Sequence, residues 1–505
     1  MNFTITDRFG SRPSGAKNRI FLTWDHWNDY SYYTLFGIFY MDSHGEKIEL
    51  GAIKIGYIGQ NISDRGLKIG DNFTRLKRNF FSLGQSLEYY EMLNLLGQEI
   101  RDEILIGLRD IAKDIKIYEK AVLEDVTKVS LFRTISPGTV TGQFRRLSNG
   151  GAKSTNYSFK FTTPSTKIIP RVTLRFDVIP ESFPPSNIHV IIGRNGVGKT
   201  YLINRMIDSL IANNYNRSNG VFKFYQSEYE NSTFANLISV TFSAFDETEP
   251  KPEIKDKTAS INYSYIGLKR IQSDRENNEA PKSTAMLNTE FFKALCSCMV
   301  SSKSKLWKDA LTTLETDPNF QESEAKTLID IENDEERRSL SNEIFKKLSS
   351  GHKIILLTIT RLIATLQEGS LVLIDEPEAH LHPPLLSAFI RALSNLLAHT
   401  NGVAIIATHS PVILQEVPKN CVWKLGRSGS QAKAERLTIE SFGENVGILT
   451  QEIFGLEVTN SGFYKILEEA VKELGSYERV LAKFDNQLGM EAKAIVRSLC
   501  QNNIF

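Results

Sequence analysis

Hydrophobic positions along this chain follow two different periods, and each period predicts a different kind of element. Residues 32–59 carry short apolar runs on either side of a polar turn at residues 42–45, the pattern of a β-hairpin. Between residues 86 and 128 the apolar positions recur at steps of three and four, which predicts amphipathic helices packed on a core. This stripe consists of Leu93, Leu96, Ile100, Ile104, Leu108, Ile111 and Ile115.

The second half of the chain alternates apolar strands with helical patterns. Residues 188–192, 371–374 and 403–407 are short apolar runs, typical of strands buried on both faces. Helical patterns precede and follow the second run, at residues 351–367 and 385–399. Because this alternation is typical of βα units, we expect a parallel sheet covered by helices on both faces.

Two further stretches complete the pattern. Residues 171–179 read as another strand. The region from about 247 to 347 is charged, and its pattern is mostly helical. We therefore interpret this region as an inserted helical subdomain rather than a continuation of the sheet.

A phosphate-binding loop directly follows the run at residues 188–192 and precedes a helical segment at residues 202–210. Its glycines allow backbone N–H groups to turn toward phosphate oxygens, and the helix N-terminus adds partial positive charge. The lysine reaches the β and γ phosphates, and the threonine hydroxyl is suited to bind magnesium. The loop consists of Gly193, Arg194, Asn195, Gly196, Val197, Gly198, Lys199 and Thr200.

Polar side chains follow the runs that end at residues 374 and 407. Asp375 and Glu376 stand at the carboxyl end of the first run, where α/β sheets place their ligands. Asp375 is suited to hold magnesium, and Glu376 to orient or deprotonate an attacking water. His409 follows the second run, and a neighbouring parallel strand would bring its imidazole to the same edge, within reach of a γ-phosphate or that water.

The segment EAHLHP suggests a second kind of site. His380 and His382, with Glu376 and Glu378 nearby, resemble a zinc site. A third and fourth ligand at typical spacing are absent from this segment, so we prefer the interpretation that it is a loop linking two nucleotide sites.

Composition narrows the class of protein. The 505 residues are enough for two to four domains. The formal charge of +1 gives no general argument for a nucleic-acid or anionic-membrane partner, and no apolar run approaches the ~20 residues that span a bilayer. Four irregularly spaced cysteines fit a reducing compartment, so we expect a soluble, cytoplasmic protein without a membrane partner. They are Cys296, Cys298, Cys421 and Cys500.

The order of four motifs resembles that of the ABC-type ATPases: GRNGVGKT, then LSSGHK, LVLIDEPEAHLHP and THSP. In that family two heads sandwich two ATP molecules with Mg²⁺, and the signature motif contacts the nucleotide held by the partner. The resemblance implies that Ser349, Ser350 and Gly351 contact the γ-phosphate from the start of a helix in the other subunit. It implies an α/β fold: an ABC-type P-loop ATPase head with a mixed, mainly parallel sheet, an antiparallel β part and an inserted helical signature subdomain.

Two departures from the family pattern are visible. His352 stands where the usual signature has glutamine, at the edge of the motif. The glutamine expected after the strand that follows the phosphate-loop helix is absent from NLISVTFSAFDE. Ser243 or Asp246 is a candidate to take over its contact with magnesium.

Within this family, the compact chain with a short helical C-terminal tail resembles the ATPase subunits of Septu and retron-associated anti-phage systems. That resemblance implies a separate nuclease partner, commonly of the HNH type, controlled by an ATPase dimer or a higher even oligomer. The alternative is a DNA-processing or repair ATPase that binds nucleic acid directly. Its candidate basic patches are Arg75, Lys77 and Arg78, and Arg145 with Arg146.

The expected domain organisation has three parts. Residues 1–165 supply strands and a helical insertion that complete the ATPase head, although residues 1–150 are alternatively an independent domain. Residues 166–430 form the ATPase core, in which the helical subdomain spans about 247–365. Residues 431–505 form a mostly helical tail.

Overall fold

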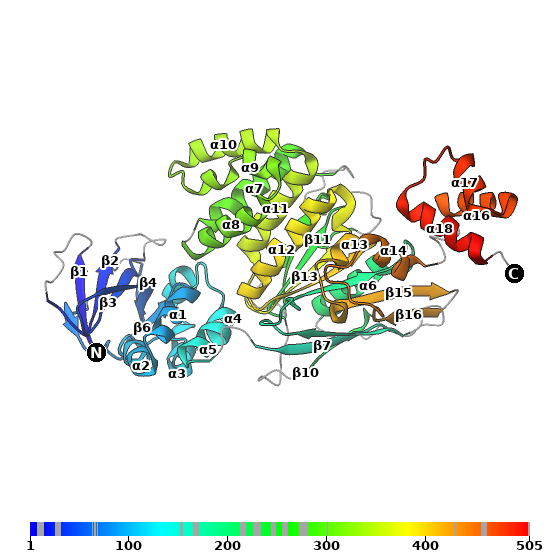
Figure 1. Cartoon of the computed structure of the whole chain (residues 1–505). Helices are drawn as coiled ribbons and strands as arrows, with labels where there is room; N and C mark the ends of the chain where they lie inside the picture. Colours follow the sequence, from blue (N-terminus) through cyan, green and yellow to red (C-terminus); the bar gives the residue numbers. More distant parts are fainter. Residues whose placement is uncertain are drawn as a thin grey trace.

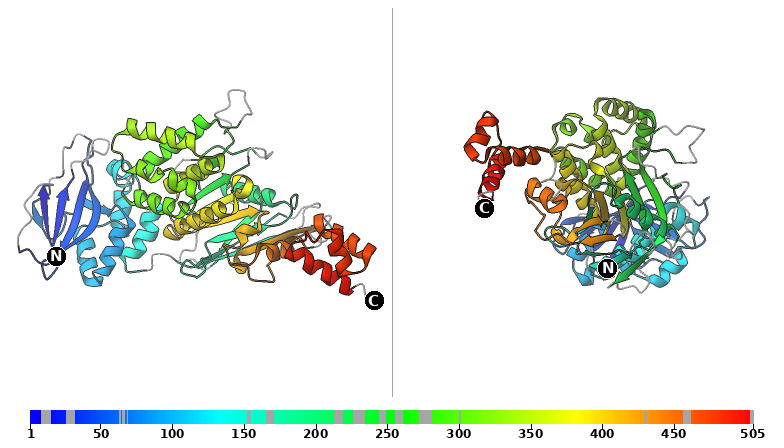
Figure 2. Two further views of the ribbon diagram at one scale, coloured as in Figure 1. Left: turned by 45° about the horizontal axis from the view of Figure 1, so that its top comes forward. Right: turned by 90° about the vertical axis from the view of Figure 1, so that its right-hand side faces the viewer.

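A computed structural model shows the fold of most of the chain. It describes residues 1–7, 15–25, 32–62, 64, 67, 69–151, 155–164, 171–212, 219–225, 234–243, 249–254, 261–271, 281–299, 301–428, 431–455 and 462–502. Figures 1 and 2 place an N-terminal sheet and the C-terminal helices at opposite ends, with a large α/β unit between them. Within the described residues, no helix is both long enough and apolar enough to cross a bilayer.

The N-terminal unit is built on a six-stranded sheet with the order β5-β1-β2-β3-β4-β6. The expected hairpin at residues 42–45 is present and joins β3 to β4 in antiparallel register. The strands are β1 (Asn2–Asp7), β2 (Arg19–Trp24), β3 (Leu35–Met41), β4 (Lys47–Tyr57), β5 (Asn72–Phe73) and β6 (Phe80–Gly84). The helices α1 (Leu87–Leu95), α2 (Gln98–Gly107) and α3 (Ile115–Ala121) confirm the predicted helical stripe. They are followed by α4 (Pro137–Thr139) and α5 (Arg145–Ser148), with π-helical turns η1 (Thr127–Leu131) and η2 (Val140–Phe144).

These early strands do not complete the antiparallel part of the ATPase head, which corrects the expectation from the sequence. Their buried side chains form a core of their own with the helices of residues 87–148. The antiparallel part of the head is instead a three-stranded sheet with the order β10-β7-β8. Its strands are β7 (Tyr157–Thr162), β8 (Thr173–Val178) and β10 (Val221–Tyr225). The hydrophobic pattern predicts strands but does not state which sheet they join, because pairing is decided by tertiary packing.

The central sheet of the head has seven strands in the order β12-β11-β13-β14-β9-β15-β16. Every neighbouring pair is parallel except β15 with β16. The strands are β9 (Ile188–Ile192), β11 (Asn236–Thr241), β12 (Asn262–Gly267), β13 (Ser370–Asp375), β14 (Val403–Thr408), β15 (Val422–Ser428) and β16 (Gln431–Glu435). The fold is therefore the expected α/β class, with a mainly parallel sheet and a separate antiparallel part.

Both faces of the central sheet are covered, which explains why its strands are almost entirely apolar. In β13, Val372 and Ile374 enter the core shared with helices α7 to α13, whereas Leu371 and Leu373 enter the core on the opposite face. That opposite core is shared with α6 (Lys199–Ile211) and with β7, β8 and β10. Alternate side chains of one strand thus fill two cores.

Most of the middle region is helical, as expected, but not all of it. Residues 262–267 form β12 at the edge of the central sheet, so the helical subdomain starts at residue 284. Its elements are α7 (Thr284–Cys298), α8 (Ser301–Leu314), α9 (Pro318–Glu322), η5 (Ala325–Ile329), α10 (Asp334–Lys347) and α11 (Ser350–Thr365). The core then continues with η6 (Pro377–His380), α12 (Pro383–His399), α13 (Pro411–Leu414) and η7 (Lys419–Cys421).

The C-terminal tail is helical after β16. Helix α14 (Val446–Phe454) packs its Leu449 and Ile453 into the core of the head. The last three helices form a small cluster around Leu467, Val480 and Val496. They are α16 (Gly462–Leu474), α17 (Tyr477–Lys483) and α18 (Met490–Asn502).

Candidate nucleotide site

The phosphate-binding loop connects β9 to α6 at the edge of the central sheet. Gly196 and Gly198 have φ angles of +78° and +101°, which glycine adopts without the strain a Cβ would cause. Gly193 is required for a different reason: a Cβ there would lie 2.5 Å from the carbonyl oxygen of Leu425 in β15. The loop therefore presents backbone N–H groups beside a helix N-terminus, an arrangement suited to phosphate.

Lys199 is the first residue of α6, and its side chain is folded onto the loop. Its Nζ donates to the carbonyl oxygens of Gly193 and Arg194, each at 3.1 Å. Burial lowers the pKa of Lys199, and the nearby carboxylates of Glu376 and Asp375 oppose this shift. The two carbonyl groups thus hold the ammonium group inside the loop. A bound phosphate would compete with them for its hydrogen bonds.

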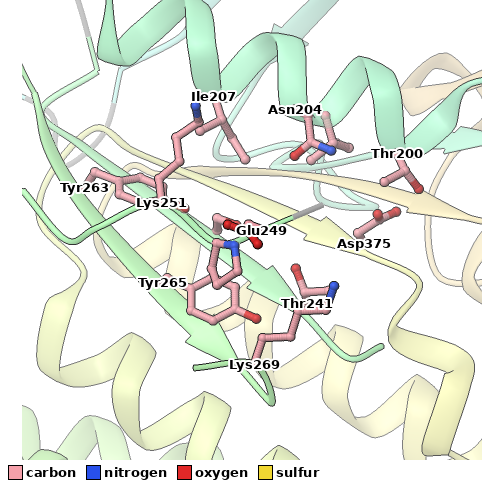
Figure 3. Close-up of a pocket in the computed structure, with 13 residues that line it drawn as sticks. Thr200, Asn204, Ile207, Thr241, Glu249, Lys251, Tyr263, Tyr265, Lys269 and Asp375 are labelled. Atoms are coloured by element: carbon pink, nitrogen blue, oxygen red, sulfur yellow. The ribbon is translucent and has the colours of Figure 1, made fainter. Parts of the chain in front are cut away.

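Thr200 and Asp375 line the same pocket beside α6, and Figure 3 shows the hydroxyl and the carboxylate facing each other. Asp375 is the last residue of β13, where its backbone is in register with Thr241 of β11 and Ala407 of β14. Its side chain is buried, with 5% of its surface exposed. A hydroxyl and a carboxylate are oxygen donors of the kind that Mg²⁺ accepts, so these two residues fit a magnesium ion.

Glu376 leaves the sheet through a sharp backbone turn. Its φ and ψ angles, 45° and 59°, lie in the left-handed region, which costs a non-glycine residue of order 1–3 kcal/mol. The turn is held by the Glu376 N–H, which donates to the carbonyl oxygen of Ala407 at 2.9 Å. Asp375 lines the pocket beside Thr200, whereas Glu376 lies beside His409.

His409 lies beside the acid pair, as the sequence predicts. Strand β14 is hydrogen-bonded to β13, and it places Nδ1 of His409 3.7 Å from a carboxylate oxygen of Glu376. The ring is 45% exposed, so it faces the solvent side of the sheet edge. The structure thus brings Glu376 and His409 together at the edge where Asp375 ends β13.

Glu378 is the residue that sequence reasoning assigned only to a zinc interpretation. Its Oε1 lies 3.1 Å from Nδ1 of His409 and accepts hydrogen bonds from the His409 N–H at 2.8 Å and the Thr408 hydroxyl at 2.5 Å. One carboxylate oxygen therefore fixes both the backbone and the ring of His409. Its position two residues after Glu376, in a motif already recognised, was the available signal.

The family glutamine that is absent after β11 has several candidate replacements, and the structure describes only some of them. Thr241 ends β11 and is the residue aligned with Asp375 across the sheet, and both line the pocket in Figure 3. Ser243 follows two residues later, whereas Asp246 lies outside the described residues. Thr241 is thus an additional oxygen donor at this edge that the sequence analysis did not consider.

The signature segment begins helix α11. Ser349 is the N-cap, and its hydroxyl oxygen accepts from the His352 N–H at 3.4 Å. Ser349 and Ser350 are exposed, whereas Gly351 is buried against the loop after the acid pair. A Cβ at Gly351 would lie 2.4 Å from the carbonyl oxygen of His380, so only glycine allows this packing.

The zinc set that the sequence analysis considered and did not prefer, His380, His382, Glu376 and Glu378, does not gather. Glu376 and Glu378 face His409, and His380 is exposed. His382 turns the other way, with Nε2 3.1 Å from a carboxylate oxygen of Asp317.

The two basic patches differ in the structure. Arg75, Lys77 and Arg78 are exposed. Arg146 is instead largely buried in an ion pair with Glu368 of the head, and the side chains are 12% and 9% exposed. The first patch is therefore an exposed basic surface, whereas Arg146 of the second is not.

Helix α14 of the tail touches the phosphate-binding loop. A guanidinium nitrogen of Arg194 donates to the carbonyl oxygen of Phe454 at 3.0 Å, and Lys424 of β15 contacts the carbonyl of Glu452. Sequence reasoning missed this contact, because hydrogen bonds to backbone carbonyls leave no pattern of residue types.

The sheet order, the phosphate-binding loop after β9 and the acidic residues at the end of β13 define the class: an ABC-like P-loop ATPase. A protein-family profile described as "AAA domain, putative AbiEii toxin, Type IV TA system" matches residues 304–415. The chain is also 40% identical over 527 aligned positions to Protein ea59 of Escherichia phage lambda, covering 99% of this chain and 98% of that protein. The chain therefore belongs to the family of Protein ea59.

Solved structures resemble the head only distantly. The ATP-binding cassette MJ1267 of an ABC transporter, in its ADP conformation, is 14% identical, with a TM-score of 0.32, over 61% of this chain and 100% of that one. UvrA2 from Deinococcus radiodurans is 12% identical, with a TM-score of 0.29, over 56% of this chain and 37% of that one. The class assignment rests on the topology and the site rather than on these likenesses.

Proposed function

We propose that two copies of this protein bind and hydrolyse MgATP at composite sites, in which each copy supplies the phosphate-binding loop of one site and the signature of the other. The observation that carries this proposal is the gathering of Glu376 and His409 at the sheet edge that also carries the phosphate-binding loop. The exposed serines at the start of α11 support it, because exposed N–H groups and hydroxyls at a helix start suit a γ-phosphate brought by another subunit.

The residues divide the chemistry as follows. Lys199 and the loop N–H groups bind the β and γ phosphates, and Thr200 and Asp375 would hold Mg²⁺, which neutralises charge on the phosphate oxygens. Glu376 orients the attacking water and accepts its proton. His409, held by Glu378, donates to the γ-phosphate or positions the water.

At a finer level, the dimer acts as the regulatory ATPase of an anti-phage defence complex and controls a separate nuclease, for which the HNH type is the candidate. Support comes from the spacing of only about 150 residues between the phosphate loop and the signature. The matching family profile, whose description names a toxin of a toxin–antitoxin system, supports a role in defence.

A second function is favoured by one observation, the exposed patch of Arg75, Lys77 and Arg78. Burial lowers the pKa of Arg109, and the nearby positive charges of Arg75 and Arg78 lower it further. Such a cluster suits a phosphate backbone, and salt-sensitive DNA binding that is lost on charge reversal of the patch would favour a DNA-processing ATPase.

The test is to purify the protein after co-expression with its genomic neighbours and to measure the mass of the assembly with and without MgATP. A co-purifying nuclease in an assembly with an even number of ATPase chains supports the defence role. A lone protein that dimerises only with MgATP contradicts that role but leaves the ATPase proposal intact.

A further inference from the structure

A second cluster of reactive side chains lies where three segments of the head meet. Asp317 is the N-cap of α9, His352 lies in the first turn of the signature helix α11, and His382 is the N-cap of α12. Within the described residues they form a group of three potential metal ligands, separate from the magnesium donors Thr200 and Asp375. None of them belongs to the nucleotide chemistry proposed above.

The two imidazole nitrogens face the two oxygens of one carboxylate. Nε2 of His352 lies 2.9 Å from Oδ1 of Asp317, and Nε2 of His382 lies 3.1 Å from Oδ2 of the same carboxylate. All three ligand atoms lie within 4.8 Å of one another. Tetrahedral zinc with bonds of about 2.0–2.1 Å needs donor atoms about 3.3 Å apart. Each imidazole nitrogen is already near this distance from one oxygen of Asp317, and binding of a single ion would also bring the two nitrogens toward each other.

The second nitrogen of each histidine already has a partner. Nδ1 of His352 lies 2.5 Å from the hydroxyl oxygen of Ser349, and Nδ1 of His382 lies 3.4 Å from the N–H of Leu385. Metal-bound histidines are normally oriented through their other ring nitrogen. With Nε2 on the metal, Nδ1 of His352 carries the proton and donates to Ser349, so its short contact fits this role. With Nε2 of His382 on the metal, its Nδ1 would also carry a proton. It could then no longer accept from the Leu385 N–H, so this longer contact would be lost.

Burial separates an inner side and an outer side of the cluster. The side chains of Asp317 and His352 are each 5% exposed, and the ring of His382 is 49% exposed. Phe320 also packs its ring against His352, with centroids 5.1 Å apart. Two ligands are thus buried, and the third faces solvent, from which an ion and a water ligand can enter.

We propose that Asp317, His352 and His382 bind one Zn²⁺ ion, with water as the fourth ligand. Two imidazole nitrogens and one carboxylate oxygen form a donor set that zinc accepts. The ion would tie the start of the signature helix and the N-terminus of α9 to the start of α12, directly after the loop that carries the acid pair. It would therefore hold the helical subdomain in a fixed position relative to the sheet.

The sequence alone did not predict this set of three ligands. His382 was visible in the H-x-H segment, but its partners lie 30 and 65 positions earlier in the chain and on different elements. Gly351 brings them together, because the absence of its Cβ lets the start of α11 approach the carbonyl of His380.

The test uses the full-length protein, stripped with a chelator and then dialysed against Zn²⁺ or Co²⁺. The main variant is His382→Ala, because its ring is half exposed, and the second is the isosteric Asp317→Asn. The matched control is His380→Ala, which removes an exposed histidine from the same loop. Metal content is measured by mass spectrometry, the Co²⁺ coordination by visible absorption, and folding by circular dichroism.

We expect wild type and His380→Ala to retain one zinc per chain and to give the intense visible absorption of tetrahedral Co²⁺. His382→Ala and Asp317→Asn should lose the stoichiometric metal and this absorption while remaining folded. A wild-type protein that retains no metal would overturn the proposal and leave the cluster as a carboxylate hydrogen-bonded to two imidazoles. Equal metal content in wild type and His382→Ala would overturn it as well. These outcomes do not depend on ATP turnover.

Discussion

At the scale of single residues, the candidate site depends on contacts that the motifs do not contain. The types and order of Lys199, Asp375, Glu376 and His409 could be predicted, because each stands at a fixed offset from an apolar strand. The role of Glu378 could not, because it depends on which way a side chain turns after the strained backbone of Glu376. The same holds for Thr241, whose position opposite Asp375 follows from strand pairing.

We predict that Glu378→Ala slows hydrolysis without weakening nucleotide binding. The substitution removes the oxygen that accepts from the Thr408 hydroxyl and the His409 N–H, so the imidazole loses its fixed position. A misplaced catalytic group costs about 10- to 100-fold in kcat, whereas the phosphate-binding loop is untouched. Steady-state ATPase assays and equilibrium ATP binding measure the two effects.

The control for this variant is Glu343→Ala, which truncates an exposed glutamate on α10. It should leave both kcat and ATP affinity at wild-type values. A Glu378→Ala protein with unchanged kcat would show that His409 does not need this carboxylate.

At the scale of elements, the hydrophobic pattern predicted most helices and strands but not all of their partners. The stripe at residues 86–128 is regular enough to be decisive, and the short run at residues 371–374 could be assigned as a strand because helical patterns lie on either side of it. Residues 262–267, NYSYIG, were included in a helical region because charged segments surround them, although tyrosine and isoleucine favour strands. A separate N-terminal domain was only the alternative expectation, because nothing local distinguishes a strand of one sheet from a strand of another.

We predict that Gly351→Ala disrupts the junction between the signature helix and the loop after the acid pair. The new Cβ would lie 2.4 Å from the carbonyl oxygen of His380, and the backbone cannot yield without moving either α11 or the loop. Such overpacking costs about 1–3 kcal/mol of stability. Chemical denaturation measures the loss, and ATPase assays should show reduced turnover.

Gly489→Ala is the matched control, because nothing lies within 4 Å of the position that a Cβ would take there and its φ angle is not positive. If both variants unfold at the same denaturant concentration, the tight packing at Gly351 is not required.

The N-terminal unit contains a buried acid that should make its stability depend on pH. Asp110 accepts from the Gly84 N–H and the Tyr90 hydroxyl, yet burial raises its pKa from 3.8 to about 6. The folded state therefore favours the protonated form. The stability this contributes is fully present below about pH 4 and is lost as the pH rises through about 6, by up to about 3 kcal/mol.

Asp110→Asn should remove this dependence, because the amide does not titrate. We expect the free energy of unfolding of wild type, relative to the variant, to fall between about pH 4 and about pH 7 and then to level off. Parallel curves for the two proteins across this range would show that Asp110 is ionised in both states.

At the scale of the whole molecule, the units are joined by a few specific contacts. Arg146 and Glu368 form a largely buried ion pair between the N-terminal unit and the head, and Glu368 also accepts from the Gln143 N–H. The tail is joined to the phosphate-binding loop through Arg194 and Phe454. A movement of the loop on nucleotide binding would therefore also displace α14. Neither of the two junctions could be predicted from the sequence.

We predict that Glu368→Ala destabilises the protein by about 3 kcal/mol, because it leaves the buried guanidinium of Arg146 without its carboxylate. The double variant Arg146→Ala/Glu368→Ala should lose less than the sum of the two single variants, which denaturation of all four proteins measures. The exposed pair Lys472 and Glu468 is the control, and its double-mutant cycle should give less than about 1 kcal/mol. Additive losses at Arg146 and Glu368 would mean that the two units are joined by other contacts.

The central claim, that ATP is held between two copies, is tested most directly by the mass of Glu376→Gln in solution. The variant keeps Lys199, Thr200 and Asp375 and so binds MgATP, but it lacks the carboxylate proposed to accept the proton of the attacking water. We predict a stable dimer with MgATP, a monomer without it, and no dimer when Lys199→Ala is added. A Glu376→Gln protein that hydrolyses ATP as fast as wild type, or that stays monomeric while saturated with MgATP, would contradict this claim.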